Sequence, residues 1–380
     1  MHPIYLDHNA TTPLLPEAWD AMRPLMSEAF GNPSSAHHTG RKARQALEDA
    51  RESVAALLGA RPDEVTFTSG ATEANNLAVF GLVTELQGGH LLASPLEHPC
   101  VIEPLTQLAA RGFELGWLPV SPRGVVPADA IISHLHPDTR LVSVMLANHE
   151  TGALQPVRDI AVSLPPDVPF HCDAAQAVGK IPVNFRELGV TALTASAHKF
   201  RGPKGVGVLL LKHGTPLRPL LFGGHQQQGR RPGTEPVPLA VGMAVALAHA
   251  VRNMDANRSH LAAIRLRFWA KLRDLAPPVV LNGPEVGSPV ALPTTLNVSF
   301  PGCRADLLLM ALDLAGVACA TGSACSSGSL LPSPVLKAMG VPEQVLRSAI
   351  RFSFGPDTTA ADIDDAADRI GSAVRRMRGS

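Results

Sequence analysis

The sequence is short of cysteine, of net charge and of long apolar runs. Its five cysteines show no Cys-x-x-Cys spacing, which argues against a disulfide framework or a zinc site and for a reducing compartment. No apolar run is long enough to span a bilayer, and the N-terminus has neither the basic nor the apolar region of a signal peptide. We therefore expect a cytoplasmic protein that does not contact membranes and holds no metal.

The lack of net charge excludes a second class of partner. The chain has 33 basic and 33 acidic residues, so it has no overall electrostatic attraction for nucleic acid or anionic lipid. Its 45% hydrophobic and 17% charged residues are typical of a folded globular protein, in spite of 34 prolines. A length of 380 residues predicts two or three domains.

Strand-like and helical segments alternate between residues 64 and 212. The strand candidates are 64–68, 90–94, 114–118, 141–146, 168–172, 193–195 and 206–212. This alternation predicts a parallel sheet with helices on both faces, and ligands at the carboxyl ends of its strands. Residues suited to chemistry follow several of those ends: His98, Asn148, Asp173, Gln176 and Lys199.

The most informative stretch is Ser196-Ala197-His198-Lys199, with the glycine-rich run 200–207 after it. One predicted strand ends just before Lys199 and another begins at Val206, so the lysine lies on a rigid strand edge. Small neighbours would let a flat ligand approach, and a carbonyl cofactor could form a Schiff base with the amine. Taken alone, the pattern also fits an ordinary surface lysine in a turn.

A candidate anion site precedes the sheet's central strands. The strand 64–68 is followed by the turn Ser69-Gly70-Ala71-Thr72-Glu73 and by a helical pattern from Ala74 to Leu86. Free N–H groups and the helix dipole would point at the turn, and two hydroxyls could add bonds. The turn lacks the glycine spacing of a dinucleotide site, which disfavours a nicotinamide-dependent dehydrogenase. As an isolated motif, the turn also fits a purely structural role.

Asp173 would supply a carboxylate at the end of a strand. A pyridoxal phosphate enzyme needs a lysine for the aldehyde, a carboxylate for the ring nitrogen and a cup for the phosphate. The carboxylate keeps the ring nitrogen protonated, so that the ring can accept electrons from Cα. A lone aspartate after a strand is often only a helix N-cap, but Lys199 at the end of the next strand favours the cofactor role.

The last third of the chain predicts a smaller α+β unit, linked to the first by an amphipathic helix over 257–275. Its predicted elements are strands at 295–300, 317–321 and 350–354, a helix at 305–315, and a final helix through Met377 that begins with a capping box at Thr359 and Asp362.

Short motifs follow one another along nearly the whole chain. They are Tyr5-Leu-Asp, Ala10-Thr-Thr-Pro13, Phe30-Gly-Asn-Pro33, Phe67-Thr-Ser-Gly-Ala-Thr-Glu73, Glu97-His98, Asn148-His-Glu150, Asp173 with Gln176, His198-Lys199, Arg231-Pro-Gly-Thr234, Gly322-Ser-Ala-Cys325 and Ile350-Arg-Phe-Ser353. In this order they resemble the cysteine desulfurases of the NifS/IscS type, in the class V aminotransferase group of fold-type I pyridoxal phosphate enzymes.

The resemblance implies a two-domain α/β fold. A large cofactor-binding domain, residues 14–255, would hold a mostly parallel seven-stranded sheet flanked by helices. Residues 1–13 and 256–380 would form a smaller α+β domain that carries the catalytic cysteine loop, at about 320–330. The resemblance also implies a homodimer.

The resemblance further implies a role for each matching residue. The catalytic residues would be Lys199, which binds the cofactor and moves protons at Cα, together with His98, which stacks on the ring, and Cys325. The cofactor pyridoxal 5′-phosphate would be bound by Ala71, Thr72, His98, Asn148, Asp173, Gln176, Ser196, His198 and Lys199, with Thr234 of the other subunit completing the phosphate site. The carboxylate of the substrate would be bound by Asn32, Asn148 and Arg351, the arginine in bidentate geometry.

Cys325 separates this chemistry from transamination. It lies among small residues with no Lys, Arg or His in its loop to activate the thiol, so activation must come from elsewhere. The resemblance implies that sulfur is removed from L-cysteine to give L-alanine and a persulfide on Cys325. That sulfur would pass to an acceptor protein, for iron–sulfur cluster assembly or for sulfuration of a cofactor, tRNA or DNA, which the sequence does not identify.

Two positions depart from the family pattern. Ala197 stands where many relatives have glycine, and its methyl group would strain the turn only if φ is positive. His149 stands where a second asparagine is frequent, so the local hydrogen bonding is expected to differ.

Two other hypotheses stay open. Within the same fold, the chain could be a selenocysteine lyase or another class V aminotransferase-type enzyme, and dependence on Cys325 would discriminate. From another class, it could be an inactive scaffold or regulatory protein of the same fold. Lys199 and Asp173 argue against that last hypothesis.

Overall fold

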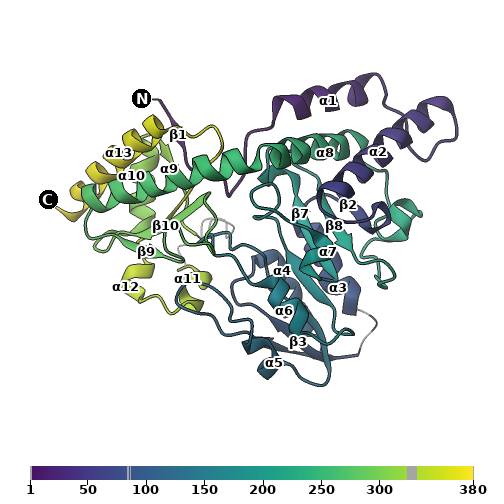
Figure 1. Ribbon diagram of the computed structural model, residues 1–380, viewed down its shortest axis with the longest axis horizontal. Coiled ribbons are helices and arrows are strands. Elements are labelled where there is room, and N and C mark those ends of the chain that lie inside the picture. The colour runs from purple at the N-terminus through teal and green to yellow at the C-terminus, as the bar shows by residue number, and fades with distance from the viewer. Residues whose placement is uncertain (1, 84, 86, 323–331, 380) are drawn as a thin grey trace.

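The computed structural model describes residues 2–83, 85, 87–322 and 332–379 (Figure 1). Cys325, the predicted nucleophile, lies outside the described residues.

A seven-stranded sheet forms the centre of the larger part of the molecule (Figure 1). Its strands lie in the order β2 (Val65–Thr68), β8 (Gly207–Leu211), β7 (Ala192–Ser196), β6 (Phe170–Asp173), β5 (Thr139–Ser143), β3 (Gly89–Ala93) and β4 (Phe113–Trp117). β8 is antiparallel to both of its neighbours, and the other six strands share one direction. The prediction of a mostly parallel seven-stranded sheet is confirmed.

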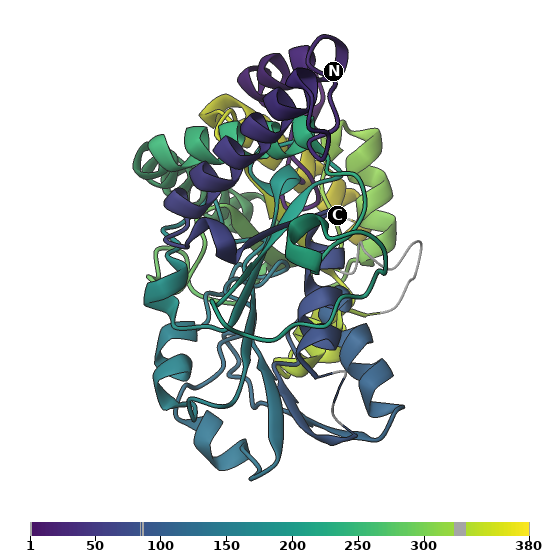
Figure 2. The ribbon, with the colours of Figure 1, turned by 90° about the vertical axis from the view of Figure 1, so that its right-hand side faces the viewer.

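Both faces of the sheet are covered by helices, which Figure 2 shows as two layers beside the strands. One face packs against α3 (Ala71–Val83) and α4 (Pro99–Ala109). The other packs against α1 (Pro16–Ser27), α2 (His38–Leu57), α5 (Ala130–His134), α6 (Val157–Ser163), α7 (Phe185–Leu188) and α8 (Val237–Arg252).

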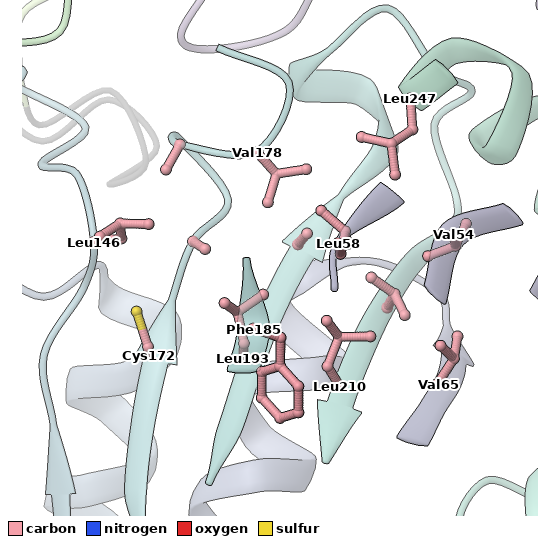
Figure 3. Close-up of a cluster of buried hydrophobic side chains, with 14 of the residues drawn as sticks. Val54, Leu58, Val65, Leu146, Cys172, Val178, Phe185, Leu193, Leu210 and Leu247 are labelled. Carbon is pink, nitrogen blue, oxygen red and sulfur yellow. The ribbon is translucent and has the colours of Figure 1, made fainter. Parts of the chain in front are cut away.

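Because side chains alternate along a strand, a single strand can contribute apolar side chains to both faces of the sheet. In β8, Val208 and Leu210 point into the larger hydrophobic cluster, while Leu209 and Leu211 point to the opposite face. Figure 3 shows Leu210 in that larger cluster beside Leu193 of β7 and Phe185 of α7. A strand buried on both sides is apolar throughout, as expected for a sheet enclosed by helices.

The second part of the chain forms a smaller sheet with its own core. The antiparallel strands lie in the order β12 (Ala349–Ser353), β10 (Thr295–Ser299) and β9 (Val280–Asn282), and β1 (Ile4–Tyr5) pairs with β11 (Val317–Ala318). Its helices are α9 (Met254–Leu275), α10 (Ala305–Leu314), α11 (Pro334–Ala338), α12 (Glu343–Leu346) and α13 (Ala360–Arg378), which opens with the predicted capping box at Thr359 and Asp362.

The hydrophobic core is divided in the same way as the sheets. One large cluster is built from residues between 15 and 292, and another joins the N-terminal Ile4 and Leu6 to residues 261–374. We propose that these clusters are the cores of the two predicted domains, 14–255 and the combination of 1–13 with 256–380.

Two further features of the described residues concern membranes and metal ions. Among the described residues, no single helix is long and apolar enough to cross a membrane; only α8 and α9 taken together, bent by 69°, have the length and composition. Both helices bury apolar side chains in the two large clusters. Within the same residues, no group of three or more His, Cys, Asp and Glu side chains is arranged to hold a metal ion.

The core of the second part depends on Phe268 of α9, which is fully buried and meets the rings of Phe352 and Phe354 edge to face at 5.1 and 5.7 Å. We predict that Phe268→Ala lowers the free energy of unfolding by about 3–5 kcal/mol, because both transfer and cavity terms are lost. Urea unfolding followed by circular dichroism measures it. The control is Leu266→Ala on the same helix, whose side chain is 58% exposed and whose loss should change stability by less than about 0.5 kcal/mol. Equal effects of the two substitutions would contradict the prediction.

Candidate active site

A cavity of about 460 Å³ opens at the carboxyl ends of β6 and β7. Eight of the predicted site residues line it: Ala71, Thr72, His98, Asp173, Gln176, Ser196, His198 and Lys199. They come from the N-terminus of α3, the loop after β3 and the ends of two neighbouring strands. The topology therefore brings together residues that are up to 128 positions apart, from Ala71 to Lys199, as expected for the carboxyl edge of such a sheet.

Lys199 ends a single turn of 3₁₀ helix, Ala197–Lys199, that follows β7 directly. Its Nζ donates hydrogen bonds to the main-chain oxygens of Asn9 and Ala10, at 2.6 and 3.0 Å. The preceding Ala197 is buried and is not among the described residues with positive φ, so its methyl group causes no backbone strain. The amine is thus held by a segment near the N-terminus, about 190 positions earlier in the chain.

The carboxylate of Asp173 is 5% exposed and faces the cavity from the end of β6. Its Oδ2 accepts a hydrogen bond from Asn75 Nδ2 at 2.8 Å, and its Oδ1 accepts one from the backbone N–H of Ala175 at 2.9 Å. Within the described chain, no lysine or arginine forms an ion pair with it. Two neutral donors therefore stabilise the charge of a carboxylate that still faces the cavity.

Gln176 follows Asp173 by three residues and lines the same cavity. Its Nε2 donates to the main-chain oxygen of Asn9 at 3.0 Å, and its Oε1 accepts from Lys180 Nζ at 2.6 Å. Asn9 thus contacts both Gln176 and Lys199. Sequence reasoning did not single out Asn9, although it lies between two of the motifs that were noted.

The predicted anion turn becomes the first turn of α3, which begins at Ala71 rather than at Ala74. Gly207 in β8 lets this turn approach, because a Cβ at that position would lie 2.6–2.7 Å from backbone atoms of Gly70. Ser196 and His198 line the same cavity as this turn. N–H groups, a hydroxyl and an imidazole thus converge on one end of the cavity, as in an anion site.

Positive charge accumulates around that end. Lys199 and Lys204 line the cavity, and burial together with these two charges lowers the pKa of His198 to about 4. His198 is therefore neutral near pH 7. Its Nδ1 lies 3.2 Å from Oγ1 of Thr11, a cavity residue of the N-terminal segment for which no role was predicted.

Two histidines form the cavity wall above the carboxylate. His98 caps α4, its Nδ1 accepting from the backbone N–H of Cys100 at 3.1 Å, and its ring meets that of His149 edge to face at 5.2 Å. Burial lowers the pKa of both imidazoles, and Lys199 and Arg351 act in the same direction on each. Both rings are therefore available as neutral bases near pH 7.

Asn148, predicted to contact the cofactor and the substrate, is not among the residues that line the cavity, and its roles stay a prediction. Its Oδ1 accepts from the backbone N–H groups of Glu150 and Thr151, each at 2.9 Å, and its Nδ2 donates to the main-chain oxygen of Leu96 at 3.1 Å. The amide is used to hold a turn. The next residue, His149, lines the cavity instead.

Arg351 lies on β12, is 4% exposed and is not among the residues that line the cavity. It pairs with Asp7 Oδ1 at 2.8 Å and donates to the main-chain oxygen of His149 at 3.1 Å. Its Nε is buried without a hydrogen-bond partner. The other two predicted contacts, Asn32 and Thr234, are exposed and do not line the cavity of this chain.

Both described flanks of the segment 323–331 meet at Glu150. Ser333 Oγ donates to Glu150 Oε2 at 2.6 Å, and a Cβ added to Gly322 would lie 1.8 Å from the same oxygen. Glu150 is 1% exposed and follows His149 in the chain. The turn that carries the cavity residue His149 is therefore also in contact with described residues on both sides of 323–331.

The comparisons with known proteins agree on one family. The family model described as "Aminotransferase class-V" matches residues 4–365. The chain is 44% identical to the cysteine desulfurase IscS of Dictyoglomus turgidum, over 99% of this chain and 95% of that protein. Among solved structures, a NifS-like protein superposes with a TM-score of 0.90 at 36% identity, over 97% of this chain and 98% of that one. SspA in complex with cysteine superposes with a TM-score of 0.82 at 35% identity, over 94% of this chain and all of that one.

We predict that Glu150 makes stability depend on pH. Burial raises its pKa to about 7 from an ordinary value of 4.5, so as pH rises between these values the unfolded chain loses the proton first. Its contribution is therefore fully present below about pH 4.5 and is lost as pH rises through 7, by about 3 kcal/mol in total. Relative to Glu150→Gln, the wild-type protein should lose stability between pH 5 and pH 8 in urea unfolding. A difference between the two proteins that stays constant with pH would contradict the assignment.

Proposed function

The chain belongs to the class-V aminotransferase family and is a cysteine desulfurase of the IscS type, and from this premise we propose that it binds pyridoxal 5′-phosphate at Lys199 and transfers sulfur from L-cysteine to Cys325. One observation supports the cofactor most directly. The cavity brings an amine, Lys199, and a carboxylate without an ion-pair partner in the described chain, Asp173, into the same space.

The chemistry of the cavity fits this cofactor at each of its functional groups. The N-terminal turn of α3 with Thr72, Ser196 and His198 suits a phosphate, because N–H, hydroxyl and imidazole donors meet positive charge there. Asp173 suits a protonated ring nitrogen, and Gln176 suits the phenolic oxygen. His98 offers a ring above the carboxylate. A cavity of about 460 Å³ is within the range of cofactor sites.

Bound at these residues, the cofactor supplies an electron sink for the Cα of an amino acid. Lys199 would move the proton at Cα, with His98 as a second acid or base, since both line the cavity and the pKa of His98 is lowered by burial. Asp173 would hold the proton on the ring nitrogen. Arg351 would bind the substrate carboxylate, as the family resemblance implies, and its hydrogen bond to the main-chain oxygen of the cavity residue His149 places it next to the cavity lining.

The sulfur step balances without an external oxidant. The Cβ–S bond of L-cysteine breaks, a bond forms between that sulfur and the sulfur of Cys325, and Cβ gains a proton. The products are L-alanine and the persulfide Cys325–S–SH. SspA, which superposes with this chain, is described in complex with cysteine, which supports cysteine as the substrate. A sulfur-acceptor protein would then take the outer sulfur.

Thr234 is the reason to propose a homodimer. It is exposed, outside the cavity of its own chain, yet its segment is anchored beside the anion turn because Arg231 pairs with Glu73 of α3 at 2.8 Å. Because its exposed hydroxyl does not line the cavity of its own chain, the role in a phosphate site that the resemblance implies for Thr234 requires a second copy of the chain. Asn32, also exposed, would complete a substrate contact only in such an assembly. We place this dimer in the cytoplasm.

We predict that Lys199→Ala abolishes covalent retention of the cofactor. After incubation with pyridoxal phosphate and desalting, the variant should lack the visible absorbance of the wild-type protein, because no other amine lies at that position. Alanine formation from L-cysteine should fall by on the order of 10³-fold, as for loss of a positioned acid–base group. The control is Lys212→Ala, an exposed lysine outside the cavity, which should behave as wild type. Undiminished alanine formation by Lys199→Ala would sink the cofactor assignment.

We predict that Cys325→Ser stops persulfide formation while cofactor binding is kept. Persulfide is measured by alkylation and mass spectrometry of intact protein after a single addition of L-cysteine, and alanine by chromatography. Cys303→Ala, which removes a buried thiol outside the cavity, is the matched control. Persulfide on the Cys325→Ser variant at the wild-type level would assign the nucleophile elsewhere, whereas selenide release without dependence on Cys325 would favour a selenocysteine lyase.

A further inference from the structure

Asn75, on α3 beneath the cavity, is the most completely bonded polar side chain near Asp173. It is fully buried. Its Nδ2 donates to Asp173 Oδ2 at 2.8 Å and to Cys100 Sγ at 3.1 Å. Its Oδ1 accepts from His171 Nε2 at 3.0 Å and from Thr194 Oγ1 at 2.5 Å. All four hydrogen-bonding positions of the amide are therefore in use.

The surrounding strands fix which way this amide points. A reversed amide would place its oxygen against the carboxylate of Asp173, so that two acceptors would face each other. On the other side, His171 Nδ1 accepts from Ser143 Oγ at 2.8 Å, and burial lowers the pKa of His171 to about 4. The imidazole is thus neutral near pH 7 and carries its single proton on Nε2, which it donates to Asn75.

This network spans three neighbouring strands of the sheet. Ser143 belongs to β5, His171 to β6 and Thr194 to β7, and all three side chains are buried. His171 and Thr194 both donate to the amide oxygen of Asn75, and Ser143 donates to His171. The sheet itself therefore orients the N–H that Asp173 receives.

We infer that Asn75 is a positioning residue for the reaction, which keeps Asp173 ionised so that the proton shared with the cofactor lies on the ring nitrogen. This inference rests on the proposed function. Hydrogen bonds donated to a carboxylate favour its charged form over the protonated one. Asn75 supplies one of the two N–H bonds that the structure gives Asp173, the other coming from the backbone of Ala175. Without the hydrogen bond from Asn75, the proton would shift from the ring nitrogen toward the carboxylate of Asp173.

The second N–H of the same amide extends this role to His98. Cys100 Sγ, which accepts from Asn75, lies 2.9 Å from His98 Nδ1. One buried side chain therefore connects the proposed partner of the ring nitrogen with the proposed partner of the ring face. A hydrophobic residue at position 75 would leave buried groups on both sides without a bond.

The test compares the holoenzyme with Asn75→Ala, using pyridoxal phosphate labelled with ¹⁵N in its ring. The ¹⁵N chemical shift reports the proton on the ring nitrogen directly, and equilibrium dialysis reports the dissociation constant of the cofactor. We expect the wild-type nitrogen to stay protonated from pH 6 to pH 9. In the variant the protonated fraction should fall within that range, and the dissociation constant should rise about tenfold to hundredfold, as for a lost charge-assisted hydrogen bond. Asn75→Ser, which is polar but too short to reach Asp173, should show the same shift and serves if the alanine variant does not fold.

The control is Asn282→Ala, which removes another buried amide with two donated hydrogen bonds: Asn282 Nδ2 donates to Asn297 Oδ1 and to Ser299 Oγ in the second part of the chain. It should leave the ¹⁵N shift unchanged. The inference would be overturned if the wild-type protein and Asn75→Ala showed the same protonation of the ring nitrogen and the same dissociation constant for the cofactor. The proposed function would still stand in that case. A shift of equal size in Asn282→Ala would also overturn it, because the effect would then be a general loss of stability. Failure of the wild-type protein to bind the cofactor would instead overturn the proposed function.

Discussion

The site depends on the way one lysine is held. An ammonium group removed from water needs acceptors, and Lys199 finds two of them in the main-chain oxygens of Asn9 and Ala10. These residues belong to the second part of the chain, since β1 pairs with β11 and the backbone N–H of Asn9 donates to Ser353 Oγ at 2.8 Å. The lysine belongs to the sheet of the first part. The amine that we propose as catalytic is therefore positioned only where both parts of the chain are folded and in contact.

The charges of the cavity follow from that arrangement. Lys199, Lys204 and Arg351 make the surroundings positive, and the lowered pKa values of His98, His149 and His198 keep three imidazoles neutral beside them. Burial and the nearby charge of Asp173 raise the pKa of Glu97 well above its ordinary value, and of these two carboxyl groups Asp173 is the one that lines the cavity. The cavity is lined by two carboxylates, of which Glu73 is paired with Arg231 and Asp173 has no such ion pair in the described chain. This arrangement suits a ligand that carries a phosphate and a carboxylate and has a protonated ring nitrogen.

Much of this site could be predicted from the sequence because strand ends are visible in it. His98, Asp173, Gln176 and Lys199 each follow an apolar run, and parallel strands bring such positions to one edge. Irregular turns gave no such signal. Within Asn148-His149-Glu150 the sequence does not show which side chain turns inward, and the ligand roles were assigned to Asn148, one residue from the histidine that lines the cavity. Asn9 and Asn75 were not predicted as site residues, because they contribute through hydrogen bonds to residues more than 90 positions away in the chain. No local sequence pattern encodes such bonds.

The position of Asn148 is explained by what the same turn must do on its other side. His149 forms part of the cavity wall, and Glu150, the next residue, contacts both Ser333 and Gly322, the described residues that flank 323–331. A turn with two such tasks has to be rigid, because a shift of its backbone would move the wall and the flanks together. The amide of Asn148 supplies that rigidity through bonds to the backbone N–H groups of Glu150 and Thr151 and to the main-chain oxygen of Leu96. The amide of Asn148 is therefore used within the turn, and the side chain that this turn presents to the cavity is that of His149.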